Sequence, residues 1–386
     1  MNSIRIIVLA TGFLFFALSA TAQVPELIND PAFREDAKVA VDSVYNFNFE
    51  SAEQKLQPWK EQYPDHPLWS LFEGMQLWWT VLSDLNDHSH DREFIKQMKK
   101  TDYVASKLLH DQSKHVDGLL IKAISNGYTA RQYANREKWI SSINYGREAI
   151  KAYNYLLDVQ PNLKDLKLAE GLKLYYLDYI PDRYPAVKTV SWAMPNGNQE
   201  KGLQFIRRAS KEGVFARAEA TYFLGNINYN YEKEFDIAVR HFEELYEQYP
   251  HNNYYVRILV KSYYRQQQFA NALQVIEESV NRWEKKELPH KGILKEELLT
   301  WKGRILEQEG NKNEALTCFK KAFEISKKLP NTQSRPFYVV SGYYAGKLLH
   351  EEGSTEQAKS YLKNVVQSNV KKSYREQANE LIKNIK

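Results

Sequence analysis

The hydrophobic positions of this chain recur with helical spacing, and one short pattern returns several times. A small residue is followed by large apolar residues four and seven positions later, and a proline stands at the twelfth position. These apolar positions share one face of an α-helix, and the proline ends that helix. The three copies are Ala52, Leu56, Trp59 and Pro64; Ala149, Tyr153, Leu156 and Pro161; and Ala238, Phe242, Leu245 and Pro250.

Three further units follow toward the C-terminus without the closing proline. Each is preceded by another amphipathic stretch, and Gly310-Asn311 and Gly353-Ser354 supply tight turns between the paired segments. A small residue is needed where two helices cross closely, because a larger side chain would hold them apart. The pattern therefore predicts antiparallel helix pairs. The three units are Ala272 and Ile276; Ala315, Phe319 and Ala322; and Ala358, Leu362 and Val365.

This spacing resembles the tetratricopeptide repeat (TPR), in which glycine, alanine, aromatic and proline positions recur in units of about 34 residues. Residues 302–322 and 224–250 are the best copies, and the likeness extends over 216–367 and, more weakly, over 37–66 and 130–165. The resemblance implies an all-α fold, a TPR-type α-solenoid in which antiparallel helix pairs form a right-handed superhelix.

A second resemblance lies in the middle of the chain. Residues 196–203 (NGNQEKGL) precede one predicted helix, and residues 216–224 (ARAEATYFL) begin the next. They are similar to an exported bacterial TPR family of unassigned function, in which a G-D-R-E-x-G-L step leads into an E-A-x-Y-F-L helix. Asn198 and Gln199 stand where that family has an acidic and a basic residue. This resemblance implies a fold and no reaction.

The chain divides into four predicted segments. Residues 1–22 are a signal peptide, 23–36 a flexible lead-in, 37–198 a degenerate N-terminal TPR-like helical region, and 199–386 regular TPR repeats with a C-terminal capping helix. The last helix is rich in charge, which suits a cap whose outer face must meet water. Within the degenerate region, 180–198 holds three prolines and few periodic apolar positions, so we expect the solenoid to be interrupted there.

The N-terminus has the layout of a secretory signal peptide. Arg5 supplies a positive charge, residues 6–19 are almost unbroken apolar sequence, and Ala20-Thr21-Ala22 forms a small-residue cleavage site. The apolar run is shorter than the roughly 20 residues that span a bilayer, which disfavours a retained membrane anchor. No cysteine stands near the cleavage site to carry a lipid. We expect an exported protein, periplasmic or secreted, cleaved after Ala22.

Charge and composition limit the functions that are expected of the chain. The net charge is +5 and 26% of residues are charged, with both signs mixed, so we expect no nucleic-acid partner. The single cysteine, Cys318, cannot form an internal disulfide, and a buried position beside Phe319 is expected for it. Phosphate-binding loops and the common catalytic motifs do not occur in the sequence, so we predict a protein that is not an enzyme and uses no cofactor.

One cluster has metal-ligand chemistry. Asp87-His88-Ser89-His90-Asp91 brings two imidazoles and two carboxylates together, which are ligands for Zn²⁺ or Cu²⁺. The alternative, which we favour, is a polar loop in which Asp91 caps the following helix.

The TPR resemblance also implies a binding face. In TPR proteins fixed positions of the first helix of each repeat line a concave groove, and here these positions are aromatic and basic. Tyr and Arg are common anchors of protein interfaces, so we expect a protein or peptide partner, one with an acidic segment. The function predicted is a non-enzymatic protein–protein interaction scaffold of the bacterial cell envelope. Tyrosines at this spacing also serve simply as packing. The predicted groove residues are Tyr222, Asn226, Tyr229, Tyr254, Arg257, Lys261, Tyr264, Arg304, Tyr343 and Lys347.

An alternative function is the binding of carbohydrate or cell wall by exposed aromatic side chains, which stack on sugar rings. Its basis is Trp69, Trp78 and Trp79. Trp78 and Trp79 are adjacent on one predicted helix, so both are not expected to face the core, and one is expected to be exposed.

Overall fold

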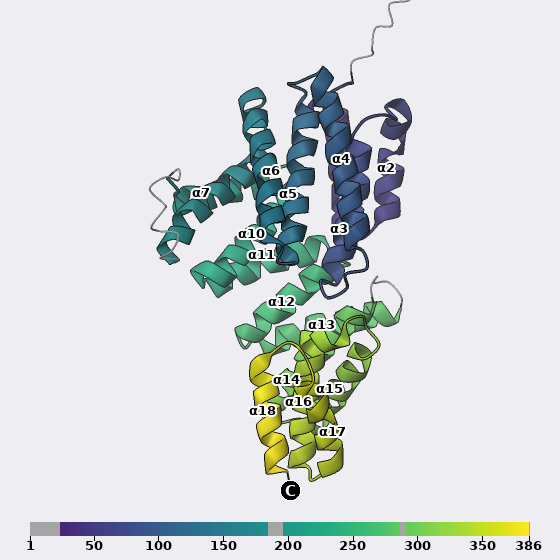
Figure 1. Cartoon of the computed structure of the whole chain (residues 1–386), viewed down its shortest axis with the longest axis vertical. Helices are drawn as coiled ribbons and strands as arrows, with labels where there is room; N and C mark the ends of the chain where they lie inside the picture. The colour runs from purple at the N-terminus through teal and green to yellow at the C-terminus, as the bar shows by residue number, and fades with distance from the viewer. Residues whose placement is uncertain (1–23, 184–195, 286–290, 386) are drawn as a thin grey trace, which may run out of the picture.

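The computed structural model describes residues 24–183, 196–285 and 291–385, and no β-strand occurs among them (Figure 1). Consecutive helices pack side by side along almost the whole of this part of the chain. The predicted all-α solenoid of antiparallel helix pairs is therefore confirmed. The predicted signal peptide and most of the predicted interruption at 180–198 lie outside the described residues.

The first half of the chain contains seven of the described α-helices, which precede residues 184–195. Proline or a side-chain cap starts several of them; Asp30, for example, accepts hydrogen bonds from the N–H groups of Ala32 and Phe33. The elements are the 3-10 helix η1 (Leu27–Asn29), α1 (Pro31–Tyr45), α2 (Phe49–Gln62), α3 (Leu68–Ser83), α4 (Asp91–Asp111), α5 (Val116–Asn135), α6 (Trp139–Val159) and α7 (Leu166–Arg183).

The second half continues with regular pairs and a single last helix. Asn198, Asn252 and Asn311 cap three of these helices with their side chains. The elements are α9 (Gln199–Glu212), α10 (Arg217–Ile227) with the π-helical turn η3 (Asn228–Glu232), α11 (Phe235–Gln248), α12 (Asn253–Arg265), α13 (Phe269–Glu284), α14 (Lys291–Gln308), α15 (Lys312–Ser326), the 3-10 helix η4 (Thr332–Ser334), α16 (Pro336–Glu351), α17 (Thr355–Val366) and α18 (Lys372–Asn384).

In three of the regular pairs, α10–α11, α14–α15 and α16–α17, a glycine of the first helix receives a large side chain of the second. The ring of Phe319 lies against Gly303, where an added Cβ would stand 2.8 Å from the ring. Phe242 fills the same space over Gly225, and Leu362 fills it over Gly346. The helices of a pair therefore approach closely only because the first helix has no side chain at the crossing.

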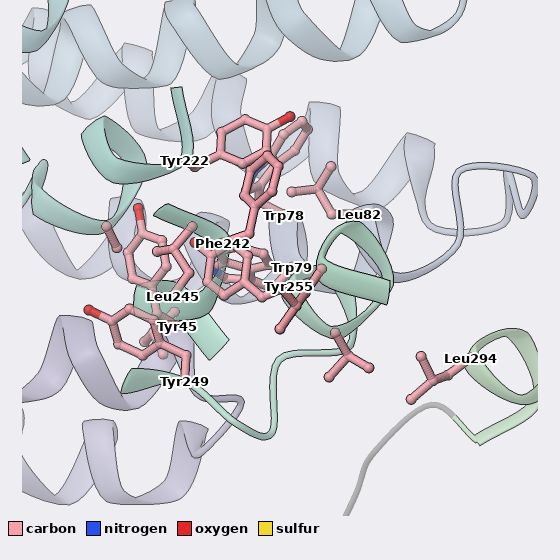
Figure 2. Close-up of a cluster of buried hydrophobic side chains, with 14 of the residues drawn as sticks. Tyr45, Trp78, Trp79, Leu82, Tyr222, Phe242, Leu245, Tyr249, Tyr255 and Leu294 are labelled. Atoms are coloured by element: carbon pink, nitrogen blue, oxygen red, sulfur yellow. The ribbon is translucent and has the colours of Figure 1, made fainter. Parts of the chain in front are cut away.

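An aromatic cluster joins the N-terminal helices to the middle of the chain (Figure 2). The ring of Tyr45 in α1 lies 5.1 Å from Trp79 in α3 and 5.6 Å from Tyr249 after α11, and Trp79 lies 5.8 Å from Tyr255 in α12. All four rings are almost fully buried. We call these four residues the aromatic seam.

Polar contacts reinforce the aromatic seam at its edge. The carboxylate of Asp42 in α1 accepts hydrogen bonds from Arg217 at 2.6 Å and from the hydroxyl of Tyr249 at 2.7 Å. The side-chain amide of Asn252 donates to the backbone carbonyl of Tyr45 at 2.6 Å. The N-terminal helices are therefore bound to α10–α12 by specific hydrogen bonds as well as by apolar burial.

The predicted flexible lead-in is wrong for residues 24–36, because these residues are bound to the helical body. Asp117 of α5, which is fully buried, accepts hydrogen bonds from the N–H groups of Leu27 and Ile28, and His115 bonds to the carbonyl of Val24 at 3.0 Å. The apolar side chain of Leu27 joins the same core as α1. A buried carboxylate needs donors, and here the N-terminal segment supplies them.

No helix in the described part of the chain is both long enough and apolar enough to cross a membrane.

The glycine contacts predict the sign of two matched substitutions. Gly303→Ala should destabilise the protein by roughly 1–3 kcal/mol, because the methyl group would overlap the buried ring of Phe319. Gly127→Ala in α5 should stabilise it by about 0.4–1 kcal/mol, because an added Cβ there meets no atom within 4 Å. Chemical denaturation measures both, and equal effects of the two substitutions would refute the close-approach argument.

Candidate protein-binding face

The ten predicted groove residues lie on the first helices of the last four regular pairs. α12 neighbours α14, and α14 neighbours α16, so these helices form a continuous row, and α18 packs beside α16 at its end. We call the side of α10, α12, α14 and α16 that carries these residues the inner face. The structure divides it into a closed part and an open part.

The closed part begins at α10, where the N-terminal helices cover the inner face. Tyr222 is only 8% exposed, and the guanidinium of Arg131 from α5 lies 5.9 Å from its ring centre. Arg131 is held by Glu219 at 2.8 Å. The hydroxyl of Tyr222 bonds to the hydroxyl of Tyr254 at 2.8 Å and accepts a bond from Asn226 at 3.3 Å. The prediction that Tyr222 lines an open groove is therefore wrong, because long-range packing buries it.

Arg257 is also taken up by internal contacts. Its guanidinium forms an ion pair with Glu297 of α14, which is itself buried, and donates to the backbone carbonyl of Ser83 at the end of α3 at 3.3 Å. Arg257 therefore joins α12, α14 and α3, and its predicted role as a partner-binding cation does not agree with this geometry.

Tyr229 is buried beneath two cations. Lys261 lies 5.3 Å and Arg265 5.4 Å from the centre of its ring. Among the described residues neither cation has an ion-pair partner within 4 Å. Partial desolvation by the surrounding protein lowers the pKa of Lys261, although its side chain remains exposed, and the positive charges of Arg265, Lys371 and Arg257 lower it further, against the opposing effect of Glu297. This region of the inner face carries excess positive charge.

The open part centres on Arg304 of α14. Its guanidinium lies among three rings, 4.7 Å from Tyr264, 5.4 Å from Trp301 and 5.6 Å from Tyr344. No carboxylate of the described residues pairs with it. Cation–π contacts stabilise such a guanidinium and leave its hydrogen-bond donors available.

Beyond Arg304 the open part ends in a shallow cleft of about 280 Å³ between α16 and α18. Tyr343 and Lys347 line it from α16, and Glu380 and Leu381 line it from α18. Lys347 is paired with Glu307 at 2.7 Å, and this pairing raises its pKa, although burial opposes the effect.

Sequence reasoning missed three aromatic residues of the open part. Trp301 and Tyr344 each stand next to a position that the repeat pattern assigns to the groove, and Tyr374 belongs to α18, which was predicted only as a cap. The ring of Tyr374 lies 5.2 Å from that of Tyr343. The clustering of aromatic residues near Arg304 was the available signal.

Both adjacent tryptophans of α3 are buried, at 0% exposed for Trp78 and 2% for Trp79. Trp78 packs against Phe94 and Tyr128 of the following helices, whereas Trp79 packs into the aromatic seam. The expectation that one of them is exposed is therefore wrong, because α3 has neighbours on opposite sides. Trp69 is buried too, so the carbohydrate alternative loses its sequence basis.

The other side chains that the sequence suggested for metal binding or reactivity make structural contacts in the described part of the chain. Asp91 does not cap α4 as predicted; it is the first residue of that helix, and it binds Arg136 at 2.6 Å and Gln132 at 2.6 Å. Among the described residues no group of three or more His, Cys, Asp or Glu side chains has the arrangement of a metal site. Cys318 is buried as predicted, and burial raises the pKa of its thiol.

Comparison with known proteins agrees with this architecture. Residues 296–329, which cover most of α14 and all of α15, match the family model of the tetratricopeptide repeat. No curated protein sequence matches the chain.

Among solved structures, the chain is similar to yeast Tom70 at 11% identity and a TM-score of 0.41, over 92% of this chain and 82% of that one. It is similar to human IFIT1, in a dimer with m7Gppp-AAAA, at 13% identity and a TM-score of 0.44, over 83% and 67%. A tetratricopeptide repeat protein from Parabacteroides merdae gives 16% identity and a TM-score of 0.34, over 80% and 97%. All three TM-scores are below 0.5, so these proteins assign no partner to this chain.

Stacked antiparallel helix pairs, three of them closed by a large side chain over a glycine, define the described part of the chain as a helical-repeat solenoid. Within this solenoid, residues 296–329 match the family model of the tetratricopeptide repeat, so the chain contains at least one repeat of that kind. Proteins of this kind present surfaces to other proteins.

The division of the inner face predicts different roles for two neighbouring cations. Arg257→Ala should destabilise the protein by about 2–4 kcal/mol, because it leaves the buried carboxylate of Glu297 without its partner. Lys261→Ala should change the free energy of unfolding by less than about 0.5 kcal/mol, because Lys261 is exposed and unpaired among the described residues. Urea denaturation of both variants checks this, and similar stability of the two would contradict the assignment of Arg257 to the closed part.

Proposed function

We propose that this chain is a non-enzymatic scaffold of the bacterial cell envelope, and that it binds an acidic segment of another protein on the open part of the inner face. The observation that carries the proposal is Arg304, held among Tyr264, Trp301 and Tyr344 and left without a carboxylate partner in the described structure. Aromatic and arginine side chains together are the residue types that anchor protein interfaces.

The charge around this site supports an acidic partner. Lys261 and Arg265 lie on α12, beside the open part, and Lys371 is close enough to Lys261 to lower its pKa. A peptide carboxylate placed here would relieve repulsion among these cations as well as form new hydrogen bonds. A peptide rich in lysine would increase this repulsion.

The proposed location rests on the sequence of residues 1–22, with its charged, apolar and small-residue regions. Val24 follows the predicted cleavage site closely, and its carbonyl is bound by His115. A mature chain that starts at Gln23 would retain this contact and the others that hold residues 24–29.

The binding proposal predicts a specific loss in one variant. A labelled extended peptide containing Asp, Glu and aromatic residues should bind the purified protein, and Arg304→Ala should weaken that binding at least tenfold, because its charge-assisted hydrogen bonds would be lost. Fluorescence anisotropy measures the affinity. The matched control is Arg240→Ala, which removes an exposed arginine from the second helix α11. Binding that is unchanged in the Arg304 variant would place the site elsewhere.

The location proposal predicts the mature N-terminus. Expressed with its leader in a Gram-negative host, the protein should be recovered from the periplasm or medium, and intact-mass measurement should give a chain that begins at Gln23. Recovery of the full-length chain from the cytoplasm in a host that exports a control protein would count against export.

A further inference from the structure

Helix α6 leaves a row of large apolar side chains uncovered. Trp139 is 61% exposed, Ile140 79%, Ile143 54% and Ile150 56%. Together with Tyr155, these are five of the nine large apolar side chains that the described residues leave exposed. Single exposed apolar residues are common, but a concentration on one helix marks an interaction surface.

The exposed row forms a stripe with a single direction. With about 3.6 residues per turn, Trp139, Ile143 and Ile150 lie on one side of the helix. The buried residues Ala152 and Leu156 lie on the opposite side of α6, which packs on α5. An added Cβ at Gly146 would meet no atom within 4 Å, so the space beside the stripe is also open.

The stripe is open because the stacking of the solenoid is interrupted at this helix. In the regular repeats the second helix of a pair packs against the first helix of the next pair, as α11 does on α12, α13 on α14 and α15 on α16. α6 and α7 do not pack along their lengths; α7 pairs with α9 and runs away from α6 (Figure 1). The stripe is therefore a surface suited to receive one more helix.

The two charges nearest the stripe are positive; of the exposed carboxylates of α6, Glu148 lies on the opposite side of the helix and Asp158 lies about two turns beyond Ile150. Arg147 and Lys151 are exposed one helical turn apart, and neither has an ion-pair partner among the described residues. Both lie within about a quarter turn of the apolar positions. A helix that docked on the stripe would be favoured by carboxylates facing these two cations.

We propose that the outer face of α6 docks an amphipathic helix of another protein, with its apolar stripe on Trp139, Ile143 and Ile150 and its carboxylates toward Arg147 and Lys151. In this mode of recognition an amphipathic helix packs its apolar face on a complementary apolar surface, and its anchor residues recur at helical spacing. A second copy of this chain fits less well, because it would bring a face with the same two cations. The site is separate from the inner face and does not depend on the function proposed for it.

The test uses two synthetic helical peptides with the same leucine stripe, one flanked by glutamates and the other by lysines. The acidic peptide should bind the full chain, and the basic peptide should bind at least tenfold more weakly. Binding is followed by anisotropy of the labelled peptide and by the shielding of Trp139 from a fluorescence quencher, with Trp139→Phe to identify its signal.

Four variants make the result specific. Ile143→Glu should weaken binding of the acidic peptide at least tenfold, because it places a charge in the apolar contact. The double substitution Arg147→Glu and Lys151→Glu should reverse the preference toward the basic peptide. Val39→Glu, at an exposed apolar residue of α1, is the matched control and should leave affinity unchanged. Arg304→Ala should also leave it unchanged, which separates this site from the inner face.

Two outcomes would overturn the proposal. One is binding of the acidic peptide that Ile143→Glu does not weaken, or equal affinity for the two peptides. The other is a concentration-dependent dimer in sedimentation experiments that Ile143→Glu abolishes, which would identify a second copy as the occupant of the stripe.

Discussion

The aromatic seam between the N-terminal helices and α11–α12 is the interaction on which the arrangement of the molecule depends. A helical-repeat chain is normally held by contacts between neighbours, so distant repeats do not touch. Here Tyr45 and Trp79 meet Tyr249 and Tyr255, and Asp42 binds both Arg217 and Tyr249. Aromatic pairs contribute about 0.5–1.5 kcal/mol each beyond their burial, so several such pairs, with the buried hydrogen bonds, hold the two regions in one arrangement.

This long-range contact decides which positions of the inner face remain accessible. Asn226 and Arg304 occupy equivalent places in their repeats, each directly after the glycine, and Asn226 donates a hydrogen bond to Tyr222. Tyr222 is covered because Arg131 of α5 reaches it, whereas α14 has no helix of the first half above Arg304. The same repeat position therefore takes part in closed packing at one end of the solenoid and remains accessible at the other.

The fold was predictable because the contacts that define each helix pair are made between residues close together in the sequence. Gly303 and Phe319 belong to one helix pair, and their spacing alone indicates the close crossing that the structure shows. Pairs without a glycine keep the same backbone turn between helices: the left-handed conformation of Gly310 and Gly353 is adopted by Phe47 and Gln267 in two other pairs. The turn is therefore present in these pairs although the glycine that would indicate it in the sequence is not.

The accessibility of the candidate binding residues was less predictable, because it depends on which distant helices pack against each repeat. The role of Arg257 rests on Ser83, which is distant in the sequence, and no repeat pattern records that contact. For the adjacent Trp78 and Trp79, the assumption of a single core was wrong, because α3 is enclosed on two sides. The exposed stripe of α6 was not predicted from the sequence for a related reason. Trp139 and Ile143 look like ordinary core positions, and only the departure of α7 leaves them in solvent.

The stripe of α6 belongs to the first half of the chain and the open part of the inner face to the second, and the aromatic seam joins the two halves. Each half would be free to turn relative to the other if only neighbouring repeats touched, because a solenoid bends by small changes at every interface. The contacts of Asp42 and Arg257 between the two halves resist such bending, since it would break charge-assisted hydrogen bonds. Two partners bound at these surfaces would therefore be held at a defined separation, which is the mechanical property that distinguishes a scaffold from a flexible tether.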